Sequence, residues 1–208
     1  MKYETALPIA DWLLQRLKPY TDRIEIAGSL RRKKPDVGDI ELICIPKIQR
    51  SATTNLLGIT EASSINLLEQ ELQRLIQEKR LAVPQETRKT PFGPRYYKLL
   101  VNPNSSLEIQ ADIFCVRPPA DWGVIFAIRT GSADFSHSLV TFALTKGMKV
   151  KDGQLFKING ANKDGMIKIP CPEEENFFNA LGVPLQAPEQ RNYWYKPPEK
   201  PVAVARQN

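Results

Sequence analysis

Four apolar residues near the N-terminus repeat with the spacing of one helix face: Ala10, Leu13, Leu14 and Leu17. This pattern predicts a helix over residues 8–18, with Pro8 in its first turn and Pro19 ending it. A similar apolar stripe predicts a second helix over residues 64–79. The N-terminal part of the chain therefore contains two amphipathic helices.

Strands are predicted where polar and apolar residues alternate or β-branched residues gather, at residues 23–28, 39–45, 81–87, 95–101 and 106–116. Residues 50–62 are mostly small and polar, so they predict a loop. Together, these elements predict a mixed sheet with helices for residues 1–117.

The composition changes at Pro118-Pro119, which suggests a domain boundary. Beyond it, the pattern predicts helices over residues 121–130 and 134–146, then short strands separated by glycines. A Pro-rich C-terminal segment begins at Pro184 and is expected to be extended. We therefore predict an α+β protein of two domains, residues 1–117 and 118–208.

Lysine and arginine number 29 against 23 aspartates and glutamates, a net charge of +6. This excess favours a polyanion such as nucleic acid as the partner, although a soluble protein with a modest lysine excess shows the same balance. No apolar run approaches the roughly 18 residues that a membrane span needs. Glu4 and Asp11 interrupt the apolar core that a signal peptide requires. We therefore expect a protein that is neither secreted nor bound to a membrane.

The three cysteines, Cys44, Cys115 and Cys171, are far apart and form no CxxC pair. This spacing argues against a disulfide framework and against a zinc site, and it fits the reducing cytoplasm. Cys44 and Cys115 are predicted to lie in the core. His137 is the only histidine, which excludes mechanisms that need two. Carboxylates are therefore the expected carriers of chemistry.

Asp39 and Glu41 lie two residues apart on a predicted strand, so both side chains point to one face. Asp112 lies within QADIFCV, where a carboxylate is unfavourable unless it is paired or bound to a cation. Three carboxylates on neighbouring strands suit a hard divalent cation such as Mg²⁺. The alternative is that these acids mark strand ends or pair with the basic residues 31–33.

A Gly-Ser turn, Gly28-Ser29, precedes the carboxylate pair and is followed by Arg31-Arg32. The N–H groups and hydroxyl of such a turn suit phosphate oxygens, and arginines add charge-assisted hydrogen bonds. Gly38 directly precedes Asp39. A phosphate-binding turn just before a pair of metal-binding acids predicts phosphoryl or nucleotidyl transfer.

These motifs resemble those of the family X DNA polymerases, the polymerase beta-like nucleotidyltransferases. GSLRRKKPDVGDIEL resembles their palm motif, and QADIF looks like the strand with their third catalytic aspartate. RTGSADFSHSLVTFALTKGMKVKDGQLF resembles the start of their thumb, and CPEEENFFNALGVPLQAPEQR is similar to their C-terminal segment. The resemblance implies a nucleotidyltransferase palm over residues 1–117 and a small α+β thumb over residues 118–208.

The resemblance also implies the roles of individual residues. The catalytic, metal-binding residues would be Asp39, Glu41 and Asp112, with Mg²⁺ as the cofactor and Mn²⁺ able to replace it. The nucleotide would contact Gly28, Ser29, Arg32, Gly38, Gly131 and Ser132. Two bound ions would stabilise the attacking and leaving oxygens of an in-line displacement.

The implied substrate is a nucleoside triphosphate, and the implied partner is a DNA primer end or a gapped or nicked duplex, as in DNA repair. We expect the protein to act as a monomer. Residues 146–168 contain six lysines. Of these, Lys146, Lys149 and Lys151 are candidate DNA contacts, and an ordinary solvated face is the alternative.

The chain departs from the family pattern at several positions. It begins where the palm begins, so we expect the lyase and fingers domains to be missing. Glu41 stands where these polymerases usually have Asp. Ile128 and Arg129 replace two aromatic residues, and we expect Arg129 to turn away from the sugar. Two other functions stay open: a nucleotidyltransferase with a non-DNA acceptor, and a DNA-binding relative without catalysis.

Overall fold

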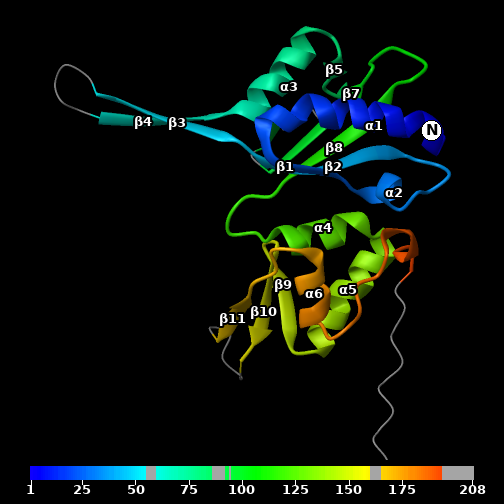
Figure 1. Cartoon of the computed structure of the whole chain (residues 1–208), viewed down its shortest axis with the longest axis vertical. Helices are drawn as coiled ribbons and strands as arrows, with labels where there is room; N and C mark the ends of the chain where they lie inside the picture. The colour runs from blue at the N-terminus through cyan, green and yellow to red at the C-terminus, as the bar shows by residue number, and fades with distance from the viewer. Residues whose placement is uncertain (55–59, 86–91, 94, 160–164, 194–208) are drawn as a thin grey trace, which may run out of the picture.

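The computed structural model of the chain describes residues 1–54, 60–85, 92–93, 95–159 and 165–193. It is an α+β protein in which an N-terminal unit with a mixed sheet lies against a smaller C-terminal unit (Figure 1). The end of the Pro-rich segment, from residue 194 on, lies outside the described residues. The proposed boundary between residues 117 and 118 stays a prediction. Within the described ranges, every helix is too short or too polar to cross a lipid bilayer.

The N-terminal sheet has the strand order β1-β2-β8-β7-β5, with β6 paired to β7. Its strands are β1 (Thr21–Ile26), β2 (Asp39–Pro46), β5 (Leu81–Ala82), β6 (Phe92–Gly93), β7 (Tyr96–Val101) and β8 (Ile109–Cys115). β2 and β8 run parallel, whereas β1 pairs with β2 and β7 pairs with β8 in the antiparallel sense. Buried and half-buried residues alternate along β7 and β8, so the two faces of the sheet differ.

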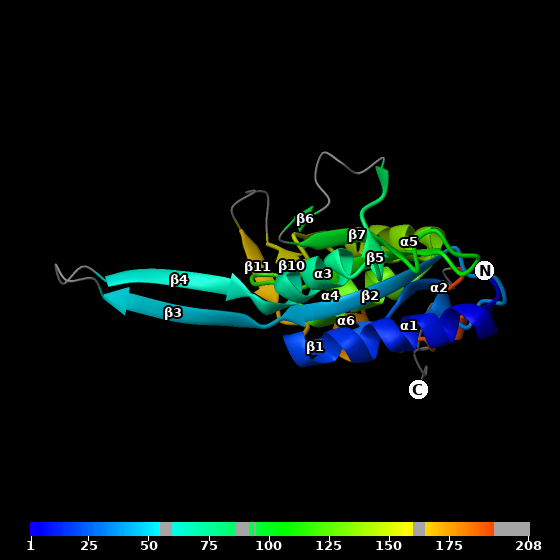
Figure 2. The ribbon, with the colours of Figure 1, turned by 90° about the horizontal axis from the view of Figure 1, so that it is seen from above.

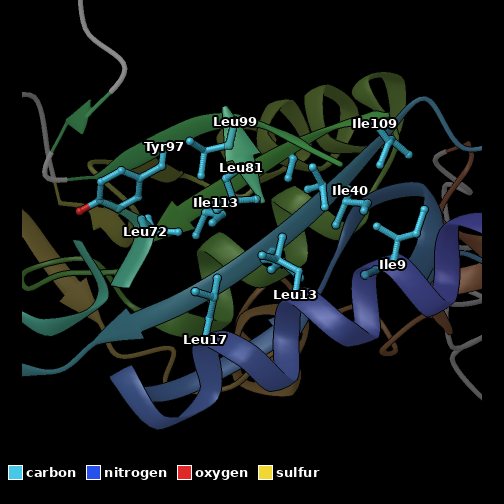
Figure 3. Close-up of a cluster of buried hydrophobic side chains, with 14 of the residues drawn as sticks. Ile9, Leu13, Leu17, Ile40, Leu72, Leu81, Tyr97, Leu99, Ile109 and Ile113 are labelled. Carbon is cyan, nitrogen blue, oxygen red and sulfur yellow. The ribbon is translucent and has the colours of Figure 1, made fainter. Parts of the chain in front are cut away.

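One face of the sheet forms the main core with α1 (Tyr3–Leu17) and α3 (Leu67–Gln77), as Figure 3 shows. Residues from both helices and from the sheet meet there: Leu13, Leu17, Ile40, Leu72 and Ile113. A 3₁₀ turn (Lys18–Tyr20) connects α1 to β1. Cys44 and Cys115 lie in this core, which confirms their predicted burial.

Among the described residues, α4 (Trp122–Thr130) covers one end of the opposite face of the sheet. It packs at the C-terminal ends of β2 and β8, with Trp122 and Phe126 against Ile43. At the beginning of β2 the face is only half-buried, and Asp39 and Glu41 project from it. The short helix α2 (Gly28–Arg31) lies beside this open end.

The C-terminal unit combines α4, α5 (Ala133–Thr145) and α6 (Glu174–Ala180) with a three-stranded antiparallel sheet of order β11-β10-β9. Its strands are β9 (Met148–Lys151), β10 (Gln154–Ile158) and β11 (Met166–Ile169), and a 3₁₀ turn (Pro188–Gln190) follows α6. Its core contains Phe135, Leu139, Leu155, Phe177 and Phe178. The two helices predicted here are confirmed to within one residue at each end.

The first helix begins earlier than the sequence pattern predicted. α1 starts at Tyr3 and contains Pro8 in its interior. The N-terminal amino group of Met1 donates to the Val37 carbonyl at 2.8 Å, and the Tyr3 N–H donates to the Pro35 carbonyl at 3.0 Å. These contacts join distant parts of the chain, so local periodicity gave no indication of them.

The predicted loop over residues 50–62 is wrong. The described residues of this stretch belong to an antiparallel hairpin of β3 (Ile48–Thr54) and β4 (Thr60–Asn66), which projects from the body of the molecule (Figures 1 and 2). β3 and β4 pair with each other outside the main sheet, and Ile48 and Ile65 stay 40% and 38% exposed. The hairpin residues are mostly small and polar, so they show no alternation of apolar and polar residues that would have predicted strands. Residues 64–66 belong to β4, so the following helix α3 begins at Leu67 instead of residue 64, where the sequence pattern predicted its start.

Candidate active site

The sheet brings the three predicted carboxylates onto one face. Glu41 of β2 is the register partner of Asp112 on the parallel strand β8, and Asp39 is the partner of Gln110. Paired residues on neighbouring strands point to the same side, and Asp39 shares that side with Glu41 because strand residues alternate. All three carboxylates are half-buried. Tertiary structure therefore gathers the acids as the sequence pattern predicted.

The carboxylates affect one another electrostatically. Burial, and then the neighbouring charge of Asp39, raises the pKa of Glu41 to about 7. Burial, and then the charge of Asp112, raises the pKa of Asp39 above its ordinary value. The guanidinium groups of Arg129 and Arg32 oppose the shift at Glu41 but do not cancel it. Negative charge is thus concentrated in a partly desolvated place that a cation would stabilise.

A divalent cation fits this donor set chemically. Oxygen ligands from carboxylates are what Mg²⁺ prefers, and its charge would remove the repulsion that raises the two pKa values. In the conformation described here, however, no three of the described histidine, cysteine, aspartate and glutamate side chains form a cluster able to hold a metal ion. Metal binding by Asp39, Glu41 and Asp112 therefore stays a prediction, and it requires these side chains to rotate toward a common point.

Gly28 allows the Glu41 carboxylate to approach α2. Its φ is +58°, in the left-handed region, and a Cβ at this position would overlap the Glu41 side chain. Gly38, in contrast, has open space around it, since a Cβ there would meet no atom within 4 Å. Gly28 is therefore required by the local packing, whereas Gly38 leaves an uncovered surface just before Asp39.

Two polar groups beside the carboxylates lack partners among the described residues. They are the buried Oγ of Ser29 and the buried Nε of Arg32. Arg32 uses its Nη1 to donate to the Thr130 carbonyl at 2.7 Å, and burial lowers the pKa of its guanidinium. Buried donors without partners are unfavourable, and an anion such as phosphate would satisfy both. This fits the predicted phosphate site, and phosphate binding there stays a prediction.

Gly131 and Ser132 form the N-terminal cap of α5. The Ser132 Oγ accepts a hydrogen bond from the Phe135 N–H at 3.1 Å and donates to the Asn192 carbonyl at 2.6 Å. At Gly131, a Cβ would overlap the Phe135 ring. Both residues thus have a structural role that explains their identity, and their predicted contact with a nucleotide sugar stays a prediction.

The three candidate DNA-binding lysines are exposed. Lys146 caps the C-terminal end of α5, and Lys149 and Lys151 point away from the core on β9. Lys168 of the same basic stretch differs, because its Nζ pairs with Asp121 at 2.9 Å. Lys146, Lys149 and Lys151 are therefore accessible to a polyanion, and DNA contact by them stays a prediction.

Comparison with known proteins finds a similarity in the C-terminal unit. Residues 126–192 match the family model described as the DNA polymerase beta thumb. Over 88 residues, the chain is 32% identical to DNA polymerase lambda of Rattus norvegicus, an alignment that covers 39% of this chain. The chain resembles a family X DNA polymerase. It spans about 15% of the length of that relative.

The family X resemblance rests unevenly on the two units. The thumb match covers the cap of α5, the exposed lysines and α6. Asp39, Glu41 and Asp112 precede the residues that match the thumb model, and the sheet places them on one face.

An ion-pair network between the units was not predicted from the sequence. Arg31 of α2 binds both carboxylate oxygens of Glu174 at 2.8 and 2.6 Å and also donates to Thr130 at 2.5 Å. Arg191, 1% exposed, binds the same carboxylate. Burial opposes the charge of Glu174, but hydrogen bonds from both arginines lower its pKa. The network places the Gly28-Ser29 turn against the C-terminal unit.

Two further residues that the sequence did not single out contact Asp112. The hydroxyl of Tyr96 donates to Asp112 Oδ1 at 2.9 Å, and the amide of Gln110 donates to the same oxygen at 3.1 Å. Gln110 shares the face of Asp112 by alternation along β8, a signal that the sequence contained. Tyr96 comes from the next strand, and only the pairing of β7 with β8 reveals it.

Proposed function

We propose that the protein is a nucleotidyltransferase of the family X polymerase type, which adds a nucleotide from a dNTP to a DNA 3′-hydroxyl and releases pyrophosphate. The observation that carries this proposal is the shared face of Asp39, Glu41 and Asp112, beside a Ser29 hydroxyl that has no partner among the described residues. The similarity to a polymerase beta thumb supports DNA as the acceptor.

In this proposal, Asp39, Glu41 and Asp112 hold Mg²⁺ or Mn²⁺. The bound cation would lower the pKa of the 3′-hydroxyl and neutralise charge that develops on the phosphate. The Ser29 hydroxyl and the Arg32 guanidinium bind triphosphate oxygens, and the open backbone at Gly38 lets the triphosphate approach. Gly131 and Ser132 support the nucleotide sugar.

The thumb-like unit supplies the contacts to DNA. Lys146, Lys149 and Lys151 bind backbone phosphates, which orient a duplex without reading its sequence. A primer end or a gapped or nicked duplex is the expected partner, and the protein acts as a monomer. We place it in the reducing compartment that its cysteine spacing indicates.

The direct test is extension of a labelled primer by the wild-type protein with dNTP and Mg²⁺, with and without a template strand. Extension supports the proposal. DNA that is bound but not extended supports the catalytically silent relative. Neither binding nor extension would point to a different acceptor.

The Asp112→Asn variant tests the carboxylates themselves. We expect its extension rate to fall at least about a hundredfold, because an amide is a poor cation ligand, while its DNA affinity stays within about twofold. Asp36→Asn is the matched control, since Asp36 is an exposed carboxylate that pairs with Lys2 away from the shared face. Equal rates for the two variants would contradict the assigned role of Asp112.

A further inference from the structure

A continuous line of side chains connects α4 to the Asp112 carboxylate. The guanidinium carbon of Arg129 lies 3.8 Å from the ring centroid of Phe114. The Phe114 ring stacks on the Tyr96 ring, with centroids 5.1 Å apart and planes at 29°. The Tyr96 hydroxyl then donates to Asp112 Oδ1 at 2.9 Å. Each contact lies on the same open sheet face as the carboxylates.

The pairing of β7 with β8 makes this line rigid. Tyr96 is the register partner of Phe114, and Lys98 is the partner of Asp112 two residues further along. The Tyr96 side chain therefore crosses diagonally to reach Asp112, a distance that long aromatic side chains span. Because its ring is stacked on Phe114, the hydroxyl is held in one position relative to β8.

The two hydrogen bonds to Asp112 both end on one oxygen. Tyr96 and Gln110 donate to Oδ1, and none of the described residues donates to Oδ2. A free carboxylate rotates readily about its terminal torsion, since that torsion is broad and roughly two-fold. Two donors on one oxygen restrict this rotation and leave the other oxygen available to a ligand.

We propose that Tyr96 is a positioning residue for Asp112. Its hydroxyl fixes the rotation of the carboxylate so that Oδ2 is presented toward Glu41, and the Arg129–Phe114 stack holds the Tyr96 ring. This inference rests on the proposed function, in which Asp112 holds a divalent cation. Hydrogen-bonding partners of a ligating carboxylate influence both cation affinity and rate, so the role is measurable without turnover.

The experiment compares Tyr96→Phe with Tyr97→Phe in the full chain. Both variants lose one hydroxyl from adjacent positions on β7, but the Tyr97 hydroxyl lies on the core face, where it accepts from Asn66 at 2.9 Å. Calorimetric titration with Mn²⁺ measures cation affinity, single-turnover primer extension measures the rate, and thermal unfolding measures any loss of stability.

We expect Tyr96→Phe to weaken Mn²⁺ binding and to slow single-turnover extension at saturating DNA and dNTP, each about tenfold. Tyr97→Phe should leave both within about twofold, even where it lowers the unfolding temperature.

The outcomes separate the positioning role from the proposed function. Equal Mn²⁺ affinities and rates for the two tyrosine variants would overturn the role of Tyr96 while leaving the transferase proposal intact. A wild-type protein that extends no primer, combined with an Mn²⁺ affinity reduced only by Tyr96→Phe, would support the positioning role and overturn the proposed function.

Discussion

At the scale of single residues, the Glu41 carboxylate occupies the space that a side chain at residue 28 would need. Gly28 also has a φ of +58°, which disfavours any residue with a Cβ. The sequence showed a Gly-Ser dipeptide suited to phosphate. The structure adds that this glycine determines where a catalytic candidate lies.

Gly28→Ala should therefore lower the free energy of unfolding by about 1–2 kcal/mol and displace Glu41. We expect primer extension to slow at least about tenfold, because small displacements of catalytic groups are costly. Gly38→Ala is the stability control, since a Cβ there meets open space and should change stability by less than about 0.5 kcal/mol. Urea unfolding of both variants measures the difference, and equal losses would contradict the packing argument.

The raised pKa of Glu41 predicts how stability depends on pH without divalent cations. The folded protein binds a proton at Glu41 up to about pH 7, whereas the unfolded chain releases it near its ordinary value of 4.5. Since the folded state binds more protons, stability should fall as the pH rises through this interval, by about 3 kcal/mol from Glu41. Asp39, whose pKa is also raised, acts in the same direction.

Glu41→Gln isolates this contribution. In EDTA at pH 8, the variant should be more stable than the wild type, and the difference should shrink toward zero at pH 5, where Glu41 is protonated. Chemical denaturation at both pH values measures it. A variant that is less stable than the wild type at pH 8 would show that the Glu41 carboxylate is stabilised in the folded state.

At the scale of elements, helix α6 joins the two units through its first turn. Glu174 is buried, with 9% of its side chain exposed, and binds Arg31 and the buried Arg191. The preceding Glu173 is 54% exposed and binds Arg23 at 2.5 and 2.9 Å. Two adjacent glutamates thus make ion pairs of very different burial.

Glu174→Gln should lower the free energy of unfolding by about 3–5 kcal/mol, because it leaves the buried Arg191 and the half-buried Arg31 without a charged partner. Glu173→Gln should change it by less than about 1 kcal/mol, since exposed ion pairs contribute little. Glutamine at residue 173 keeps a side-chain oxygen for the helix cap that Glu173 provides. Urea denaturation compares them, and similar losses would show that burial of the pair is unimportant.

At the scale of the whole molecule, the net charge of +6 predicts salt-sensitive DNA binding without sequence preference. Lys149 and Lys151 lie on the exposed side of β9. If both contact phosphates, the variant Lys149→Gln/Lys151→Gln should reduce the slope of log affinity against log salt by about 2.

The variant Lys2→Gln/Lys18→Gln is the charge-matched control for that measurement. Both of its lysines are exposed at the ends of α1, on the other unit. Its salt slope should equal that of the wild type. Fluorescence anisotropy on two unrelated duplexes between low and moderate salt measures all three proteins. Equal slopes for the two double variants would show that β9 does not contact DNA.

The local sequence determined the features that depend on short spacing. Alternation placed Asp39 and Glu41 on one strand face, and apolar periodicity identified the helices α4 and α5 within a residue at each end. Such patterns are readable because burial of one face imposes a period on the chain. The hairpin β3–β4 consists mostly of small and polar residues, and so it offered no such pattern.

Only the tertiary structure decided which distant residues meet. Strand register brought Asp112 beside Glu41, and strand pairing brought Tyr96 to Asp112 across 16 positions of the chain. The fold likewise joined Arg31 to Glu174, 143 positions away. Local sequence cannot specify such contacts, because a hydrogen bond or ion pair across the fold leaves no periodicity in either segment. Asp112, Tyr96, Arg31 and Glu174 meet their partners because two hydrophobic cores form and α4 packs on the sheet.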